Sequence, residues 1–197
     1  LGNPVLEPPA EIFEALREIA GRRGEGLHRY MTNAGFPHVR AAVAATLAAD
    51  FPGITADHIV MTTGAAGALN TVLKTILDPG DEVIVLVPYF AEYMFYVRNH
   101  GGVPVLCETG PDFDLDIEAL SRAITPRTKV ILVNSPHNPT GRIYPQASLE
   151  ALGRLLSERE VAIGHPIYLI SDEPYREIVF IEGAPPSPAT FHPRSFQ

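Results

Sequence analysis

The sequence predicts an α/β fold, in which a mostly parallel sheet carries helices on both faces. Short apolar runs of strand length, such as 83–87 and 130–133, alternate with longer stretches that have a helical period. The nineteen prolines fall mostly between these segments, where they mark turns. Strands that alternate with helices in this way form βαβ units, which set the strands parallel and lay the helices over the sheet.

The first fifty residues are expected to hold two helices separated by a loop. Residues 11–22 have apolar side chains at helical spacing. These side chains share one face: Ile12, Leu16 and Ile19. Residues 24–35 are rich in glycine, asparagine and polar side chains, which are typical of a loop. The helical period resumes at 39–47.

From residue 59 onward, strands and helices are expected to alternate. The expected strands are short apolar runs at 59–62, 82–87, 103–107, 129–133 and 167–170. The expected helices lie between them at 64–77, 90–99, 117–124 and 149–159. Residues 184–197 are rich in proline and are expected to form a loop that adds nothing to the sheet.

The composition predicts a soluble, globular protein. No apolar run approaches the roughly 20 residues that cross a membrane. The net charge of -8 argues against a nucleic-acid-binding surface, which needs clustered lysine and arginine. The single cysteine, Cys107, rules out an internal disulfide and is expected to be a core thiol. The single cysteine fits a reducing compartment, and the sequence shows no recognisable signal peptide. We therefore expect a cytoplasmic protein.

Two expected strands end in polar, turn-rich segments. The segment 134–141 reads Asn-Ser-Pro-His-Asn-Pro-Thr-Gly, and the segment 171–175 reads Ser-Asp-Glu-Pro-Tyr. In an open parallel sheet, ligands bind just beyond the carboxyl ends of the strands. We therefore expect Asn138, Asp172 and Tyr175 to bring an amide, a carboxylate and a phenol to one ligand site.

A turn of small residues precedes the helix expected at 64–77. Gly64, Ala65 and Ala66 stand at its start, where backbone N–H groups are free and the helix dipole is positive. Small side chains let a phosphate approach these groups closely. A tight turn that needs small residues only for packing remains an equal alternative. Neither a G-x-G-x-x-G nor a Walker A pattern is present, so nucleotide binding has little support.

The roles of three residues have more than one possible interpretation. Phe90 belongs to an aromatic cluster at a strand end, which either offers a flat face to a ring or packs the junction of sheet and helix. A partly buried Asp172 demands a partner, and a protonated ring nitrogen, a helix N-cap or an ion pair would serve. His137 is either a supporting hydrogen-bonding group or a solvated loop histidine. No metal site is expected.

Taken together, these motifs resemble those of the pyridoxal-phosphate-dependent aminotransferases of classes I and II, which have the aspartate-aminotransferase-like fold. The resemblance covers nearly the whole chain and keeps the family's order of motifs. Five segments carry it: 1–9, 30–40, 78–83, 138–141 and 172–175. The last two, Asn-Pro-Thr-Gly and Asp-Glu-Pro-Tyr, are the most specific.

The resemblance implies roles around the ring of the cofactor, pyridoxal 5'-phosphate. Asp172 would pair with the protonated pyridine nitrogen, which keeps the ring an electron sink. Asn138 and Tyr175 would hydrogen-bond the ring's 3-oxygen, and these three residues would form the catalytic set. Phe90 would stack on the ring face, where many relatives carry a larger aromatic side chain.

The resemblance also implies contacts to the phosphate and the substrate. Backbone N–H groups of Ala65 and Ala66 would hold the phosphate, and Gly64 would also belong to the cofactor-binding residues. Tyr30 would reach the phosphate of the neighbouring subunit in a homodimer. Gly2 would lie near the substrate carboxylate, together with Asn138. The partners would be an amino acid and a 2-oxo acid, with no nucleic acid and no membrane.

The family attaches its cofactor to a lysine, and the sequence has only Lys74 and Lys129. Lys74 follows Gly64 by ten residues on one helix, about 15 Å along the axis. Lys129 opens its strand and so lies at the end opposite Asn138. Neither is expected to be the attachment lysine, so we expect an incomplete piece of a longer enzyme.

Residues 1–30 are expected to form an N-terminal segment, and residues 31–197 a partial cofactor-binding large domain. The expected activity of the full-length protein is amino-group transfer, and the piece alone is expected to be inactive. A β-lyase or decarboxylase of the same fold, or the sensing domain of a transcription regulator, would carry the same motifs. A non-enzymatic α/β binding module is a further alternative.

Overall fold

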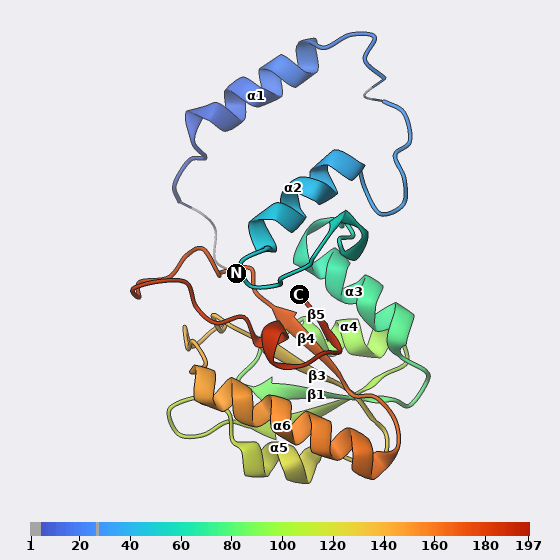
Figure 1. Cartoon of the computed structure of the whole chain (residues 1–197), viewed down its shortest axis with the longest axis vertical. Helices are drawn as coiled ribbons and strands as arrows, with labels where there is room; N and C mark the ends of the chain where they lie inside the picture. The colour runs from blue at the N-terminus through green and yellow to red at the C-terminus, as the bar shows by residue number, and fades with distance from the viewer. Residues whose placement is uncertain (1–4, 27) are drawn as a thin grey trace.

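The computed structural model describes residues 5–26 and 28–197, and its centre is a five-stranded parallel sheet (Figure 1). The strand order is β2-β1-β3-β4-β5, and every neighbouring pair is parallel. The strands are β1 (Glu82–Val87), β2 (Val103–Glu108), β3 (Thr128–Asn134), β4 (Tyr168–Asp172) and β5 (Ser195–Phe196). The expected α/β class with a parallel sheet is therefore confirmed.

Helices cover both faces of this sheet (Figure 1). One face carries α3 (Gly64–Ile76) and α4 (Tyr93–Asn99), and the other carries α5 (Ile117–Ala123) and α6 (Gln146–Ile163). The helix α6 forms because its leucines recur every three or four residues on one face, where they are buried. It ends at Gly164, whose positive φ of 80° provides a left-handed C-cap.

The central strands β1, β3 and β4 divide their apolar side chains between two cores. In β3, Ile131 and Val133 pack with α5 and α6, whereas Val130 and Leu132 pack with α3 and α4. Successive side chains of a strand point to opposite faces, so a strand covered on both faces needs apolar residues at every position. This requirement explains the unbroken apolar runs in the sequence.

The N-terminal elements are α1 (Ala10–Gly21), α2 (Pro37–Leu47) and the short 3-10 helix η1 (Ala56–His58). None of the residues of α1 is buried, and the helix lies apart from the sheet (Figure 1). The guanidinium of Arg40 in α2 donates a hydrogen bond to the carbonyl of Ile59 at 2.8 Å. That bond ties α2 to the segment that leads into α3.

Two expectations for the sheet were wrong. Residues 59–62 form no strand, because their backbone is not paired with any described strand; Met61 instead donates to the carbonyl of Ala34 at 2.9 Å. Residues 184–197 are not all loop, since they contain the 3-10 helix η2 (Pro188–Phe191) and the strand β5. The strand forms because Leu169 on the open edge of β4 donates to the carbonyl of Arg194.

The remaining expected elements are present, with ends displaced by up to four residues. The largest change is in α6, which was expected at 149–159. No helix in the described part of the chain combines the length and the apolar character needed to cross a membrane.

Candidate active site

A cavity of about 230 Å³ lies beyond the carboxyl ends of β3 and β4, beside the first turn of α3. Its lining contains most of the residues that the sequence predicted: Ala65, Ala66, Phe90, Asn138, Asp172 and Tyr175. These residues come from four separate regions of the sequence. They meet because parallel strands end at the same edge of the sheet and each connection returns to that edge.

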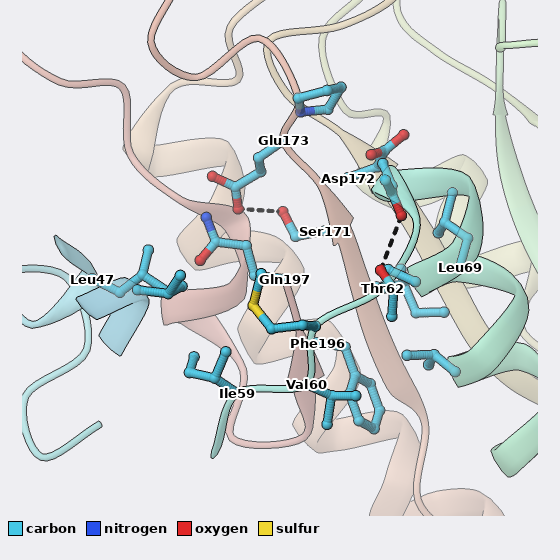
Figure 2. Close-up of a pocket in the computed structure, with 18 of the residues that line it drawn as sticks. Leu47, Ile59, Val60, Thr62, Leu69, Ser171, Asp172, Glu173, Phe196 and Gln197 are labelled. Carbon is cyan, nitrogen blue, oxygen red and sulfur yellow. Dashed lines mark hydrogen bonds between the residues drawn. The ribbon is translucent and has the colours of Figure 1, made fainter. Parts of the chain in front are cut away.

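A second cavity, of about 390 Å³, adjoins Asp172 (Figure 2). It lies between the extended segment 59–62 and the end of β4, and apolar side chains such as Leu69 and Phe196 line much of it. Gly64 and Ala65 also line it, so this space continues from Asp172 to the start of α3. The carboxylate of Asp172 is thus accessible from both cavities.

Asp172 is the last residue of β4 and makes a short hydrogen bond within the cavity. The hydroxyl of Tyr93 donates to its Oδ2 at 2.5 Å. Burial raises the pKa of Asp172, and the Tyr93 hydrogen bond lowers it in part. The pKa of Tyr93 itself is raised, first by burial and then by the nearby carboxylate. A positive charge beside Asp172 would stabilise its ionised form further.

Sequence reasoning missed Tyr93 as a site residue. Only 2% of its surface is exposed, and its ring makes an edge contact with Phe90 at a centroid distance of 5.6 Å. Tyr93 and Asp172 are 79 residues apart in the sequence, so no local pattern links them. The available signal was the aromatic cluster at the end of β1, whose members were assigned only to packing or to stacking.

Asn138 and Tyr175 form the outer wall of the cavity. The amide Nδ2 of Asn138 lies 3.4 Å from the hydroxyl of Tyr175, to which it donates a long hydrogen bond. Tyr175 is 40% exposed, so this wall of the cavity borders solvent. The two groups can together donate to one ligand oxygen.

Ser171 and Glu173, the two neighbours of Asp172, anchor its loop to the sheet (Figure 2). The Glu173 carboxylate accepts hydrogen bonds from the hydroxyls of Ser171, at 2.6 Å, and Ser187, at 2.5 Å. Its other oxygen pairs with Arg176 at 2.9 Å, and Arg176 also reaches Asp50 at 2.8 Å. The side chain of Glu173 is only 3% exposed, so this cluster holds the loop from the inside.

The start of α3 suits a bound anion. No side chain caps this helix; the N–H of Gly64 donates to the carbonyl of Thr62 at 3.0 Å, and the N–H groups of Ala65 and Ala66 are left available to a ligand. Gly64 has a positive φ of 68°, and a Cβ atom added to it would meet no atom within 4 Å. Ala65 and Ala66 are exposed to the cavity with side chains of minimal size. This geometry provides the uncrowded N-terminus at which phosphate binds in other proteins.

These donors and acceptors fit a phosphorylated, cationic ring such as pyridoxal 5'-phosphate. The free helix N-terminus suits the phosphate, and the buried Asp172 carboxylate suits a protonated ring nitrogen. Phe90 lines the same cavity and provides an aromatic ring. The residues present therefore meet the chemical needs of both ends of the cofactor.

Three other residues named in the sequence analysis are not found in the described lining of the cavity. Tyr30 is fully exposed and does not line it, and Gly2 lies outside the described residues. His137 is only 6% exposed, so the reading of a solvated histidine is wrong; burial lowers the pKa of His137. Of the two lysines, Lys129 lies over the ring of Tyr168 at 6.0 Å, and neither lysine lines the cavity of the described structure.

Comparison with known proteins gives one consistent result. Residues 1–193 match the family described as aminotransferase class I and II. A probable aspartate/prephenate aminotransferase of Thermus aquaticus is 43% identical over 98% of this chain and 48% of its own length. The aspartate/prephenate aminotransferase of Thermus thermophilus is 42% identical with the same coverage.

Solved structures agree with the sequence matches. An amino transferase from Eubacterium rectale superposes with a TM-score of 0.94 at 32% identity, covering 99% of this chain and 50% of the other. A single mutant of the aspartate aminotransferase from Thermus thermophilus gives a TM-score of 0.87 at 41% identity, with equal coverage. The chain spans about half the length of these relatives. With the family match over residues 1–193, these similarities establish that the chain belongs to the class I and II aminotransferases.

Proposed function

We propose that this chain provides the cofactor-binding part of an aminotransferase, which moves an amino group between an amino acid and a 2-oxo acid. The observation that carries the proposal is the buried carboxylate of Asp172 in a cavity that also contains the open start of α3. Family membership supports the same reaction class, because the two relatives from Thermus carry aminotransferase names.

The residues of the cavity would bind and orient pyridoxal 5'-phosphate. When bound, this cofactor supplies an electron sink for negative charge on the carbon of the substrate amino acid. Asp172 holds the positive charge of the ring nitrogen, and Tyr93 keeps the Asp172 carboxylate in place. Asn138 and Tyr175 donate to the ring's 3-oxygen, since their polar atoms share the outer wall of the cavity.

The phosphate would bind at α3, with the N–H groups of Ala65 and Ala66 as donors and Gly64 beside them, where the lack of a side chain leaves room for the phosphate. Phe90 would cover one face of the ring. We retain Tyr30 as a contact to the cofactor of a second subunit in a homodimer; the full exposure of its side chain supports such a contact. The roles of Gly2 and Asn138 toward the substrate carboxylate, the division at residue 30 and a cytoplasmic location belong to the same proposal.

The covalent attachment of the cofactor requires a lysine that neither Lys74 nor Lys129 supplies. Lys129 occupies the opposite end of β3 from the cavity, and Lys74 lies in the last turn of α3. We therefore expect residues 1–197 alone to have no transaminase activity. Turnover by purified 1–197 would contradict this part of the proposal.

The proposal is tested with the intact protein that contains this chain. Pyridoxal 5'-phosphate is titrated into the apoprotein while its absorbance is followed, and amino transfer is then assayed with a panel of amino acids and 2-oxo acids. The panel includes aspartate and prephenate, which appear in the names of the relatives. Binding together with amino transfer supports the proposal, whereas an apoprotein that does not bind the cofactor refutes it. Elimination products without amino transfer would instead indicate a lyase.

A further inference from the structure

Asn134 lies in the floor of the cavity, between the two strand ends that carry Asn138 and Asp172. It is the last residue of β3, is only 3% exposed and has no assigned role so far. Its Oδ1 accepts the backbone N–H of Asn138 at 2.6 Å. Its Nδ2 donates to the backbone carbonyl of Asp172 at 2.7 Å. One buried amide therefore joins the backbones of two residues assigned to the ring.

The backbone of Asp172 is held by other bonds as well. Asn134 and Asp172 are register partners in the pairing of β3 with β4, and the N–H of Ser135 also donates to the Asp172 carbonyl at 3.2 Å. Asp172 would thus stay in the sheet without the Asn134 side chain. The ladder makes Asp172 the fixed point of the site.

Asn138 depends on Asn134 to a greater degree. It stands four residues beyond the end of β3, in a turn closed by bonds between His137 and the backbone of Gly141 and Arg142. Those bonds shape the turn but do not connect it to β4. Among the hydrogen bonds of the described residues, the Asn138 N–H has only the Asn134 side chain as its acceptor.

We propose that Asn134 is a positioning residue that fixes the separation between the Asn138 amide and the Asp172 carboxylate. This inference rests on the proposed function, in which those two groups bind opposite parts of one rigid ring. An asparagine suits the task because a single planar group both donates and accepts. The Asn134 side chain makes both hydrogen bonds to backbone atoms, so it acts on the ring only through Asn138 and Asp172.

The test compares the affinity of the intact apoprotein for pyridoxal 5'-phosphate in the wild type and in Asn134→Leu, which keeps a similar shape but loses both polar atoms. We expect binding to weaken by about tenfold, the effect of roughly one net hydrogen bond. Ser135→Ala is the matched control, because Ser135 directly follows Asn134, its hydroxyl accepts the N–H of Tyr144, and it is not among the residues that line the cavity. The affinity of Ser135→Ala for the cofactor should be within about twofold of the wild-type affinity, because this variant loses only one weak hydrogen bond.

A double variant separates positioning from general loosening of the structure. If Asn134 acts through Asn138, adding Asn134→Leu to Asn138→Ala should cost much less affinity than it costs in the wild type. Fully additive losses would overturn the inference, because they mean that Asn134 acts independently of Asn138.

Asn134→Asp provides a second variant if the leucine form does not fold. Its carboxylate can still accept from Asn138 but cannot donate to Asp172, so we expect an affinity between those of wild type and Asn134→Leu. Wild-type affinity in the substituted forms that fold would overturn the role of Asn134 while leaving the proposed function intact. A wild-type protein that fails to bind the cofactor would instead refute the proposed function.

Discussion

Replacing Tyr93 with phenylalanine removes the hydroxyl that donates to Asp172 and leaves the rest of the ring in the core. The lost bond is 2.5 Å long and its acceptor is a carboxylate whose pKa is already raised by burial. Hydrogen bonds to charged groups stabilise folded proteins by about 1.5–3 kcal/mol. Because this bond favours the ionised carboxylate, its loss should raise the pKa of Asp172 further.

The sign of this effect makes the loss of stability depend on pH. A carboxyl group with a raised pKa in the folded state binds its proton more tightly than in the unfolded chain, so its contribution to stability is present at acid pH and lost as the pH rises. In Tyr93→Phe this loss is larger, because the pKa of Asp172 is higher still. The difference in unfolding free energy from wild type should therefore grow from about 1 kcal/mol near pH 4, where a neutral hydrogen bond is lost, to about 1.5–3 kcal/mol at pH 8.

The measurement is denaturant unfolding of the intact apoprotein between pH 4 and pH 8, for wild type, Tyr93→Phe and Tyr96→Phe. Tyr96 is the matched control, because it lines the same cavity, and among the described hydrogen bonds none joins it to Asp172. A loss in Tyr93→Phe that is the same at every pH would refute the reasoning. So would a loss equal to that of Tyr96→Phe, since the hydroxyl would then matter only as a buried polar group.

Three further predictions follow from other contacts. Gly153→Ala should destabilise the protein by about 1–3 kcal/mol, because its Cβ would stand 2.2 Å from the carbonyl oxygen of Phe191. The control Gly21→Ala has open space around the added Cβ and should not destabilise the protein. Equal unfolding midpoints for the two variants would contradict the close packing at Gly153. Glu173→Gln should lower the free energy of unfolding by about 1.5–3 kcal/mol, because it removes a buried charge that pairs with a guanidinium and two hydroxyls. Limited proteolysis should then cleave loop 173–187 faster than in the wild type. Unchanged cleavage would contradict the anchoring role of Glu173. Asp172→Asn should reduce amino transfer at least 100-fold, as expected when a charge that stabilises the reacting state is lost, and near-normal turnover would remove Asp172 from the catalytic set.

The sequence was sufficient for features that depend on local pattern. The strand β1 was predicted with its observed limits, because an unbroken apolar run has few alternatives in an α/β chain. Asn138, Asp172 and Tyr175 were expected together because they follow strands whose ends must meet. The resemblance to a family supplied their chemical roles, which remain predictions.

Features that depend on distant partners were not predictable in the same way. Residues 59–62 have the composition of a strand, but composition does not reveal whether a neighbouring strand is available. The two residues of β5 are too few to show a period, and they pair because β4 presents an open edge. Tyr93 joins the site through a contact across 79 positions, which only the assembled fold brings within reach.

The sheet also separates the residues that line the cavity from a core whose residues do not line it. The residues that line the cavity of about 230 Å³ come from α3, α4, the last residues of β3 and β4, and the loops that follow the strands, whereas α5 and α6 pack a separate core on the opposite face. Substitutions in that second core can alter thermal tolerance without altering the groups that would contact the ring. Natural variation and directed evolution for stability can therefore change the core under α5 and α6 while the cavity residues on the other face are preserved.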